Sequence, residues 1–230
     1  MAPLRPSFAR EREAWAESHL LVGVDEVGRG PLAGPVVAAA VVFPAKCRGV
    51  RGVRDSKTLP APARERLAAM ILSRALGVGL GAASVREIDR LNIRVATALA
   101  MRRAIVHLFR IVPGQAYRIL IDGLPLPEVG YTHQALVDGD ARCHSIAAAG
   151  IVAKTVRDRL MHRLAVRYPR YGWDTNVGYG TLTHQVGLRA HGPTCHHRIT
   201  FGMVGQPGLF DELADGLEAV PLHPSQGVPV

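Results

Sequence analysis

The chain is predicted to fold as an α/β domain with a mixed central sheet flanked by helices. Short β-branched runs bounded by Gly and Pro, such as 20–24 and 36–43, are typical of buried strands. Segments with apolar residues at helical spacing lie between such runs, and this alternation favours one sheet covered by helices. The 230 residues are enough for one such domain with short appendages.

Each expected element has a local reason. The segment 62–76 has apolar residues at helical spacing and stops at Gly77. Ser84 and Glu87 form a capping box, which opens a short helix. Small residues dominate the first turns of 145–166, so this helix can lie very close to another element. The expected strands are 20–24, 36–43, 78–83 and 117–121, and the expected helices are 62–76, the short one opened at 84–87, 92–109, 145–166 and 181–191.

The chain divides into three parts. Residues 1–18 are expected to form an N-terminal extension. Residues 19–205 are expected to form the main domain, including a helical C-terminal part. Residues 206–230 are rich in Pro and Gly and partly acidic, which predicts a weak helix followed by a flexible, disordered end.

The composition favours a folded chain with an anionic partner. Hydrophobic residues make up 48% and charged residues 20%, which argues against global disorder. Lys and Arg number 28 against 19 Asp and Glu, a formal charge of +9. Such a charge favours a polyanion or an anionic surface as partner, although an arginine-rich composition without a specific partner would give the same number.

Three scattered cysteines, Cys47, Cys143 and Cys195, argue against a disulfide framework and fit a reducing compartment. The N-terminal residues contain no continuous apolar stretch of the kind that a signal peptide has. The longest apolar run, 36–43, is much shorter than the ~20 residues that span a bilayer. We therefore expect a soluble cytoplasmic protein without membrane contact, and nothing in the sequence indicates an obligate dimer.

Three carboxylates lie at or just past the ends of expected strands. Asp25 and Glu26 follow the run 20–24, and Asp122 follows 117–121. If these strands are neighbours, the carboxylates converge, and a bound divalent cation would relieve their repulsion. Oxygen ligands suit Mg²⁺ or Mn²⁺ rather than Zn²⁺, and two such ions can hydrolyse a phosphodiester. A solvated turn is the alternative for an isolated Asp-Glu pair.

A fourth acid has two candidates. Asp140 lies in an expected loop just before helix 145–166, whereas Asp158 lies within that helix, roughly 20 Å along its axis. If the small-residue end of the helix packs near the strand ends, Asp140 reaches the metal and Asp158 does not. Asp158 is then an ion-pair partner of the flanking Arg157 and Arg159.

Several loops offer groups to phosphate or sugar. Glycines flank Arg29 at positions 28 and 30, so backbone there can approach a ligand closely. Lys57 could hold a phosphate as a point charge and Ser56 could donate to one, unless this is a solvated loop. Tyr179 lies between glycines and could stack on a sugar or base, or be a core tyrosine. The residues Cys195, His196 and His197, taken with His184 and His191, match no closed zinc pattern, and His197 with Arg198 is expected as a surface or phosphate-facing pair.

This set of residues resembles the signature of type 2 ribonuclease H (ribonuclease HII), a family of bacterial enzymes among others. The resemblance runs in order over roughly 20–203, and its first block alone is highly specific. Its motifs are 24–35 (VDEVGRGPLAGP), 55–59 (DSKTL), 88–89 (ID) with 91–93 (LNI), 120–123 (LIDG), 139–140 (GD), 145–154 (SIAAAGIVAK) with 157–158 (RD), 168–169 (YP), 178–181 (GYGT) and 197–198 (HR).

The resemblance implies a ribonuclease H-like fold and an endonuclease that requires Mn²⁺ or Mg²⁺. Its substrates would be RNA–DNA hybrids and duplex DNA with single embedded ribonucleotides, cut to 5′-phosphate and 3′-hydroxyl ends during ribonucleotide excision repair and DNA replication. The tail 206–230 could contact a replication protein. Carried over residue by residue, the metal-binding catalytic acids are Asp25, Glu26, Asp122 and Asp140, the 2′-hydroxyl is read by Gly28, Arg29 and Gly30, phosphate is contacted by Ser56 and Lys57, and the following deoxyribose stacks on Tyr179.

Two positions depart from the family pattern. Asn176 and Val177 stand where the family usually has His-Lys, so a phosphate contact beside Tyr179 is in question. Gly150 stands where a serine is usual, which removes a hydroxyl and is expected to loosen the helix. Because neither change touches the acids, we expect activity to survive.

Two other functions fit parts of the pattern. A related junction resolvase would use similar acids but would cut all-DNA junctions and ignore the 2′-hydroxyl. A non-catalytic nucleic-acid-binding module would use the +9 charge equally well, but it has no need for convergent acids, which repel phosphate.

Overall fold

The computed structural model describes residues 5–205, whereas residues 1–4 and 206–230 lie outside the described part. Its centre is a five-stranded mixed sheet, as the sequence predicts. The strands are, in spatial order, β3 (Gly77–Ala83), β2 (Val36–Val42), β1 (Leu20–Val27), β4 (Tyr117–Asp122) and β5 (Gln134–Leu136).

Strand β1 lies at the centre and sets the register. It pairs antiparallel with β2, which pairs antiparallel with β3, and it pairs parallel with β4, with Val24 opposite Ile121. Strand β5 adds to β4 in parallel. The four expected strands are present. Strand β5 was not expected, because its three residues are too few to show an alternating pattern.

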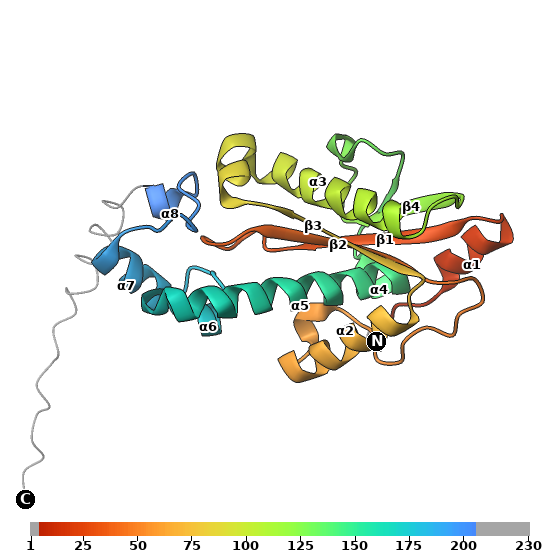
Figure 1. Ribbon diagram of the computed structural model, residues 1–230, viewed down its shortest axis with the longest axis horizontal. Coiled ribbons are helices and arrows are strands. Elements are labelled where there is room, and N and C mark those ends of the chain that lie inside the picture. Colours follow the sequence, from red (N-terminus) through yellow and green to blue (C-terminus); the bar gives the residue numbers. More distant parts are fainter. Residues whose placement is uncertain (1–4, 206–230) are drawn as a thin grey trace, which may run out of the picture.

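Helices cover both faces of the sheet, with α3 on one face and α5 and α2 on the other (Figure 1). The five expected helices are present, and four further short ones, α1, α4, α6 and α8, were not expected. The helices are α1 (Ala9–Ala16), α2 (Ala61–Arg74), α3 (Val85–Ile111), α4 (Gly139–Arg142), α5 (His144–Arg167), α6 (Trp173–Asn176), α7 (Leu182–His191) and α8 (Gly202–Gly205), with 3₁₀ turns at Ser56–Thr58, Pro127–Val129 and Pro169–Tyr171.

Helix α3 consists of two segments, as the separate sequence signals indicate. The capping box of Ser84 and Glu87 opens the first segment. A kink follows at Asn92, which has a φ of 67°. The Asn92 side chain accepts hydrogen bonds from the N–H groups of Arg94 and Val95, so it caps the second segment.

Two apolar cores lie against the two faces of the sheet. On the α3 face, Val22, Val24 and Ile121 of the strands pack in one buried cluster with Met101 and Ile105. The opposite face packs the alternate residues of β2 against the small residues of α5 and the apolar side of α2. Because both faces are covered, β1 and β2 are apolar at nearly every position, as buried strands require. Within residues 5–205, none of the helices combines the length and apolarity that a bilayer crossing requires.

The N-terminal segment is packed into the domain. Its helix α1 buries Glu11, whose carboxylate accepts hydrogen bonds of 2.7 Å from both the N–H and the hydroxyl of Ser145 in the first turn of α5. An anion at a helix N-terminus satisfies free N–H groups and interacts favourably with the helix dipole. Helix α1 therefore caps the long helix from outside. The tail 206–230, expected to be flexible, lies outside the described residues.

The first residue of α5, His144, is buried and neutral. Its ring stacks on Phe8, and its Nε2 accepts a hydrogen bond of 3.2 Å from the N–H of Val50. Burial lowers the pKa of His144 to about 4, from the ~6.5 of an unfolded chain. Between these two pH values the unfolded chain binds the proton and the folded chain does not, so stability is lost as the pH falls through this window.

A His144→Gln variant should therefore depend less on pH than the wild type. The amide oxygen can still accept from Val50, but the side chain does not titrate. Buried carboxyl groups of the folded protein titrate in the opposite sense, so the quantity to measure is the difference in free energy of unfolding between variant and wild type. From pH 7 to pH 5 this difference should shift in favour of the variant, by at most about 1.4 kcal/mol per pH unit. Parallel pH profiles in urea titrations would contradict the assignment.

Candidate functional site

Two adjacent acids lie in the last part of the central strand. The sequence placed Asp25 and Glu26 at or past the end of a strand 20–24, but β1 continues to Val27. Pairing with β4 stops at Val24, whereas pairing with β2 continues, with Asp25 opposite Ala39. The acids therefore emerge where one neighbour of β1 has ended and the other holds the backbone rigid.

The Asp25 carboxylate is buried against helix α5. Its Oδ1 accepts a hydrogen bond of 2.7 Å from the N–H of Glu26. A Cβ added at Gly150 would lie only 2.3 Å from its Oδ2, so the glycine lets the carboxylate approach the helix backbone. The sequence indicated only that Gly150 would loosen the helix, and the structure supplies the packing reason for it. Burial raises the pKa of Asp25 well above its ordinary value, and the charges of Glu26 and Asp122 raise it further.

Asp122 and Asp140 come to the same place from β4 and α4. Oδ1 of Asp122 accepts a hydrogen bond of 2.7 Å from the N–H of Gly139, which ties the end of β4 to the start of α4. Asp140 lies in the first turn of this short helix, where a loop was expected. Burial raises the pKa of Asp140, and the charge of Asp122 raises it further. Asp25 also feels the charges of both residues, so the three carboxylates share one electrostatic environment.

Lys57 faces this group of acids. Burial alone would lower the pKa of its ammonium group, but the charges of Asp55, Asp25, Asp140 and Asp122 outweigh burial and raise it. Asp55 holds the turn, because its carboxylate accepts a hydrogen bond from the N–H of Lys57. Ser56 beside it is buried, with its hydroxyl 3.8 Å from the Cβ position of Gly150. The structure thus brings Ser56 and Lys57 close to the acids.

The acids do not form a ready-made metal cage. Within residues 5–205, no three Asp, Glu, His or Cys side chains are arranged closely enough to hold an ion as they stand. In the same part of the chain, Asp25, Asp122 and Asp140 have no Lys or Arg within ion-pair distance, whereas Glu26 pairs with Arg29 at 3.3 Å. Carboxylates without a cationic partner, two of which (Asp25 and Asp140) have raised pKa values, are the donor set that a hard divalent cation would draw together and stabilise.

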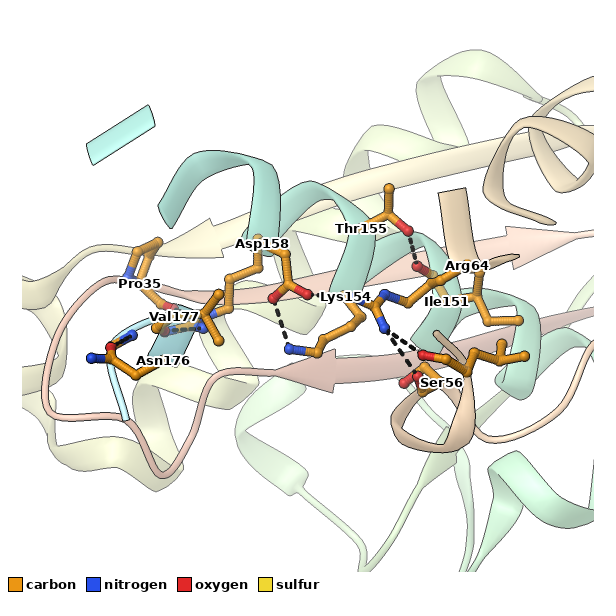
Figure 2. Close-up of polar contacts among 12 residues, drawn as sticks. Pro35, Ser56, Arg64, Ile151, Lys154, Thr155, Asp158, Asn176 and Val177 are labelled. Atoms are coloured by element: carbon orange, nitrogen blue, oxygen red, sulfur yellow. Dashed lines mark hydrogen bonds and ion pairs between the residues drawn. The ribbon is translucent and has the colours of Figure 1, made fainter. Parts of the chain in front are cut away.

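The glycine loop after the acids is held by a buried arginine of α5. Gly28 has a φ of +92°, and a Cβ there would lie 2.2 Å from the Nε of Arg157. Arg157 is fully buried. Its guanidinium donates three hydrogen bonds of 2.9–3.0 Å to the backbone carbonyls of Ala33, Pro35 and Val177. Pro35 and Val177 are labelled in Figure 2. The sequence had assigned Arg157 to Asp158 as an ion-pair partner, which is wrong.

A second buried arginine holds the same loop from the other side. Arg198 is fully buried, and its guanidinium donates to the carbonyl oxygens of Gly28 at 2.6 Å, Arg29 at 2.8 Å and Gly34 at 2.8 and 3.0 Å. Burial lowers the pKa of Arg198 to about 9. The expectation of a surface or phosphate-facing pair at 197–198 is therefore wrong, because both side chains are inside. No sequence motif signals this role, since the acceptors are carbonyls that every residue has.

Tyr179 lies beside the glycine loop. A Cβ added at Gly30 would lie 3.7 Å from the Tyr179 ring, and Tyr179 as a residue is 45% exposed. The N–H of Leu32 donates to the carbonyl of Gly178, which ties the two loops together. Arg29, the neighbour of Gly30 in the chain, is half exposed and pairs with Glu26. Arg29 and Tyr179 are therefore both accessible beside the glycine loop.

The departure at positions 176–177 has a structural consequence. Asn176 is buried and bridges the turn, because its amide donates to the carbonyl of Tyr171 and its Oδ1 accepts from the N–H of Gly178. Val177 has a φ of 43° and offers its carbonyl to Arg157. These residues hold the backbone of the Tyr179 loop.

Asp158 is not part of the acid group. Its carboxylate pairs with Arg64 of α2 and with Lys154 one turn earlier in α5, each at 2.7 Å, as Figure 2 shows. The flanking arginines, which the sequence predicted as partners, contact other groups: Arg157 donates to backbone carbonyls and Arg159 pairs with Glu65. Arg64 also donates to the carbonyls of Leu59 and Ser56, so the ion pair braces the turn that carries Lys57.

Variants of Asp158 and Asp140 should therefore fail in different ways. Asp158→Asn removes the partner of two cations, and breaking a buried ion pair costs about 3–5 kcal/mol of stability. The folded fraction should still cleave within about tenfold of the wild-type rate, because the loss acts on the bracing of the Lys57 turn rather than on an acid of the site. Asp140→Asn should remove cleavage and leave the melting temperature nearly unchanged. If Asp158→Asn is stable and inactive, the choice between the two acids is wrong.

The histidines form a buried polar network rather than a zinc site. His184 and His197 lie 3.0 Å apart through their Nε2 atoms. Nδ1 of His184 donates to the carbonyl of Tyr179, whereas Nδ1 of His197 accepts from Thr194, so His197 donates to His184. Burial lowers the pKa of both imidazoles, to about 4 for His197. The pair supports the Tyr179 loop, and exposed Cys195 takes no part in it.

Asp89 is a further structural acid, which the sequence indicates only as part of the motif 88–89. Its carboxylate accepts hydrogen bonds from the N–H groups of Ile199 and Thr200 and from the Thr200 hydroxyl. It thereby anchors the segment that directly follows Arg198 to helix α3.

Comparison with known proteins identifies the family. The family profile described as Ribonuclease HII matches residues 22–204. Among curated relatives, a Ribonuclease HII of Granulibacter bethesdensis is 53% identical over 207 residues, covering 87% of this chain and 90% of the relative. A Ribonuclease HII of Synechococcus sp. (strain JA-3-3Ab) is 51% identical over 201 residues, covering 86% of this chain and 89% of the relative.

Solved structures share the fold. The ribonuclease H2 from Pyrococcus horikoshii OT3 has a TM-score of 0.65 at 22% identity, over 84% of this chain and 99% of that chain. The RNase HII in the PCNA:RNase HII complex from Archaeoglobus fulgidus has a TM-score of 0.65 at 25% identity, over 79% and 95%. Bst-RNase HIII in complex with Mn²⁺ has a TM-score of 0.64 at 21% identity, over 85% and 71%. With its ribonuclease H-like fold, the chain belongs to the ribonuclease HII family and is an endoribonuclease that acts on the RNA strand of RNA–DNA hybrids.

Proposed function

We propose that this enzyme also incises duplex DNA on the 5′ side of single embedded ribonucleotides, leaving 5′-phosphate and 3′-hydroxyl ends. The strongest support is that a group of carboxylates and a rigidly held glycine loop lie next to each other. Asp25, Asp122 and Asp140 share one electrostatic environment with Lys57. Next to them, the backbone around Gly28 is held in a fixed shape by two buried arginines.

We infer that Asp25, Glu26, Asp122 and Asp140 hold divalent cations, Mn²⁺ or Mg²⁺. The fit rests on the donor chemistry, because all four are carboxylates and burial raises the pKa values of three of them. It rests also on Gly150, which leaves room for Asp25 beside the helix. Two cations bound there would supply an activated water and stabilise the leaving oxygen of an in-line displacement. Bst-RNase HIII, which shares the fold, was solved in complex with Mn²⁺.

The remaining residues would recognise the substrate. Backbone groups of Gly28 to Gly30 and the side chain of Arg29 would contact the 2′-hydroxyl, the group that distinguishes RNA from DNA. The exposed Tyr179 ring would stack on the sugar of the next nucleotide. Lys57 would contact a backbone phosphate as a point charge, with Ser56 as a hydrogen-bond donor.

The test uses two duplexes that differ only in one strand, and a separate four-way junction made of DNA alone. In one duplex that strand contains a single ribonucleotide, and in the other it contains a run of ribonucleotides. We expect cleavage of the first two with Mn²⁺ or Mg²⁺, none with EDTA, and no cleavage of the junction. Cleavage of the junction would favour a resolvase. Absence of Mn²⁺ binding at millimolar concentration in calorimetry would favour a binding module.

A contact with a replication protein through the tail 206–230 stays a prediction. The Archaeoglobus fulgidus relative was solved in a complex with PCNA. The tail of this chain lies outside the described residues.

A further inference from the structure

A cavity lined by arginines lies apart from the acids. It has a volume of about 750 Å³, is open to solvent, and is lined by the N-terminal segment, the loop between β2 and α2, helix α2 and the start of α5. None of the residues proposed to bind metal or to read the 2′-hydroxyl lines it. The lining arginines are Arg5, Arg48, Arg51, Arg54 and Arg74.

The positive charge of this cavity is not neutralised. No carboxylate is among its lining residues. Within residues 5–205, none of its five arginines has an Asp or Glu within ion-pair distance. Arg74 is oriented by one hydrogen bond of 2.8 Å to the carbonyl of Gly49, which leaves its other N–H groups available. Five guanidinium groups around one cavity repel one another, and an anion bound among them would relieve that repulsion.

The floor of the cavity is buried and uncharged. Phe8, Val50 and Val53 are buried there. His144 lies between Phe8 and Val50, with burial lowering its pKa to about 4, so it adds no charge at neutral pH. The arginines are therefore carried by an ordered frame, which lowers the entropy cost of fixing them around a ligand.

The chemistry of the lining selects phosphate. The planar guanidinium fork binds phosphate oxygens through two parallel hydrogen bonds, and several such forks suit a ligand with more than one phosphate. The position of the loop in the chain indicates which ligand with several phosphates this is. Arg54 is three residues from Lys57, so their Cα atoms lie at most about 11 Å apart. Successive phosphates of a strand are separated by ~3.4 Å along the duplex axis, so the cavity begins within about three nucleotides of the phosphate at Lys57.

We propose that this cavity binds the phosphate backbone of the substrate duplex a few nucleotides from the cleavage position. The assignment rests on the proposed function for the identity of the substrate. It extends the surface that contacts the duplex from the acid site along the loop 48–57. The arginines of the cavity, which contribute to the net charge of +9, would then bind phosphate groups of the duplex. Such contacts position the duplex and carry no sequence information.

The test compares two double variants of equal charge change. Arg48→Gln with Arg51→Gln removes two charges from the cavity. Arg102→Gln with Arg110→Gln removes two exposed charges from α3, on the opposite face of the sheet (Figure 1). Affinity for a 20-base-pair duplex with one ribonucleotide is measured in EDTA over a range of salt concentrations. The cavity variant should bind the duplex about tenfold more weakly. The slope of its log binding constant against log salt concentration should be smaller in magnitude by ~0.9 for each phosphate that it no longer neutralises. Its kcat with divalent metal at saturating duplex should be unchanged. The control variant should match the wild type.

Two outcomes would overturn the assignment. One is equal duplex affinity for both double variants. The other is loss of inorganic tripolyphosphate binding in the cavity variant without any change in duplex affinity, which would make the cavity a site for small phosphates instead. Because binding is measured without metal, it does not depend on cleavage. A wild type that binds the duplex through this cavity but does not incise it with Mn²⁺ would refute the proposed function and leave the cavity assignment in place.

Discussion

Replacement of Asp122 by Asn is expected to abolish cleavage while binding of the duplex persists. The amide oxygen of Asn can still accept the hydrogen bond from Gly139, so the link between β4 and α4 remains. The substitution removes the charge of one of the carboxylates that would hold the cations. We expect the cleavage rate of a single-ribonucleotide duplex to fall roughly 10³-fold or more. Duplex affinity should be equal or higher, because one charge that repels phosphate is gone.

The control for this variant is Asp174→Asn. Asp174 is exposed in α6, and its replacement makes the same change in net charge. Its cleavage rate should equal that of the wild type. The measurements are single-turnover cleavage with Mn²⁺ and duplex affinity in EDTA. An Asp122→Asn enzyme that cuts at the wild-type rate would show that the acids are assigned wrongly.

The second large effect is expected at Arg198. A lysine there keeps the charge, but its single ammonium group cannot reach the carbonyls of Gly28, Arg29 and Gly34 together. Each hydrogen bond from a charged donor is worth about 1.5–3 kcal/mol, and the carbonyls left without a donor would be buried. For Arg198→Lys we expect kcat/KM on a single-ribonucleotide duplex to fall about 10- to 100-fold.

The lost hydrogen bonds lower the stability of the fold, and their loss should also act on recognition. We compare the cleavage rate of the single-ribonucleotide duplex with that of a duplex in which an all-RNA strand is paired with DNA. The ratio of the first rate to the second should fall, because the loop would no longer hold its carbonyls in place. A merely structural role would lower both rates equally. Arg159→Lys, at an exposed ion pair with Glu65, should leave the ratio and the melting temperature unchanged. A well-folded Arg198→Lys variant with the wild-type ratio would refute the positioning role.

The sequence predicted most of the fold because its signals are local. Strand β2 and the first five residues of β1 are continuous apolar runs, and the capping box at Ser84 marks a helix start that the structure confirms. Elements without such signals were not predicted. Strand β5 is three residues long, and α4 is a single turn whose role depends on the contact between Gly139 and Asp122.

The candidate acids could be named from the sequence because they follow strands and because their motifs resemble one family. Asp158 shows the limit of that reasoning. Two arginines flank it in the chain, yet helical geometry turns them away, and its partners are Lys154 one turn back and Arg64 from another helix. Nearness along the chain is a poor guide to ion pairs on a buried helix.

By itself the sequence determined four of the five strands, the acids near the ends of two of them and the glycine loop beside these acids. Only the tertiary structure decided what holds these parts in place. Arg157 and Arg198 act through backbone carbonyls, which have no sequence signature, and Gly150 matters because Asp25 lies against it. The arginine cavity likewise joins residues from four separate segments. Contacts of this kind depend on how distant segments pack, and no local pattern of side chains encodes them.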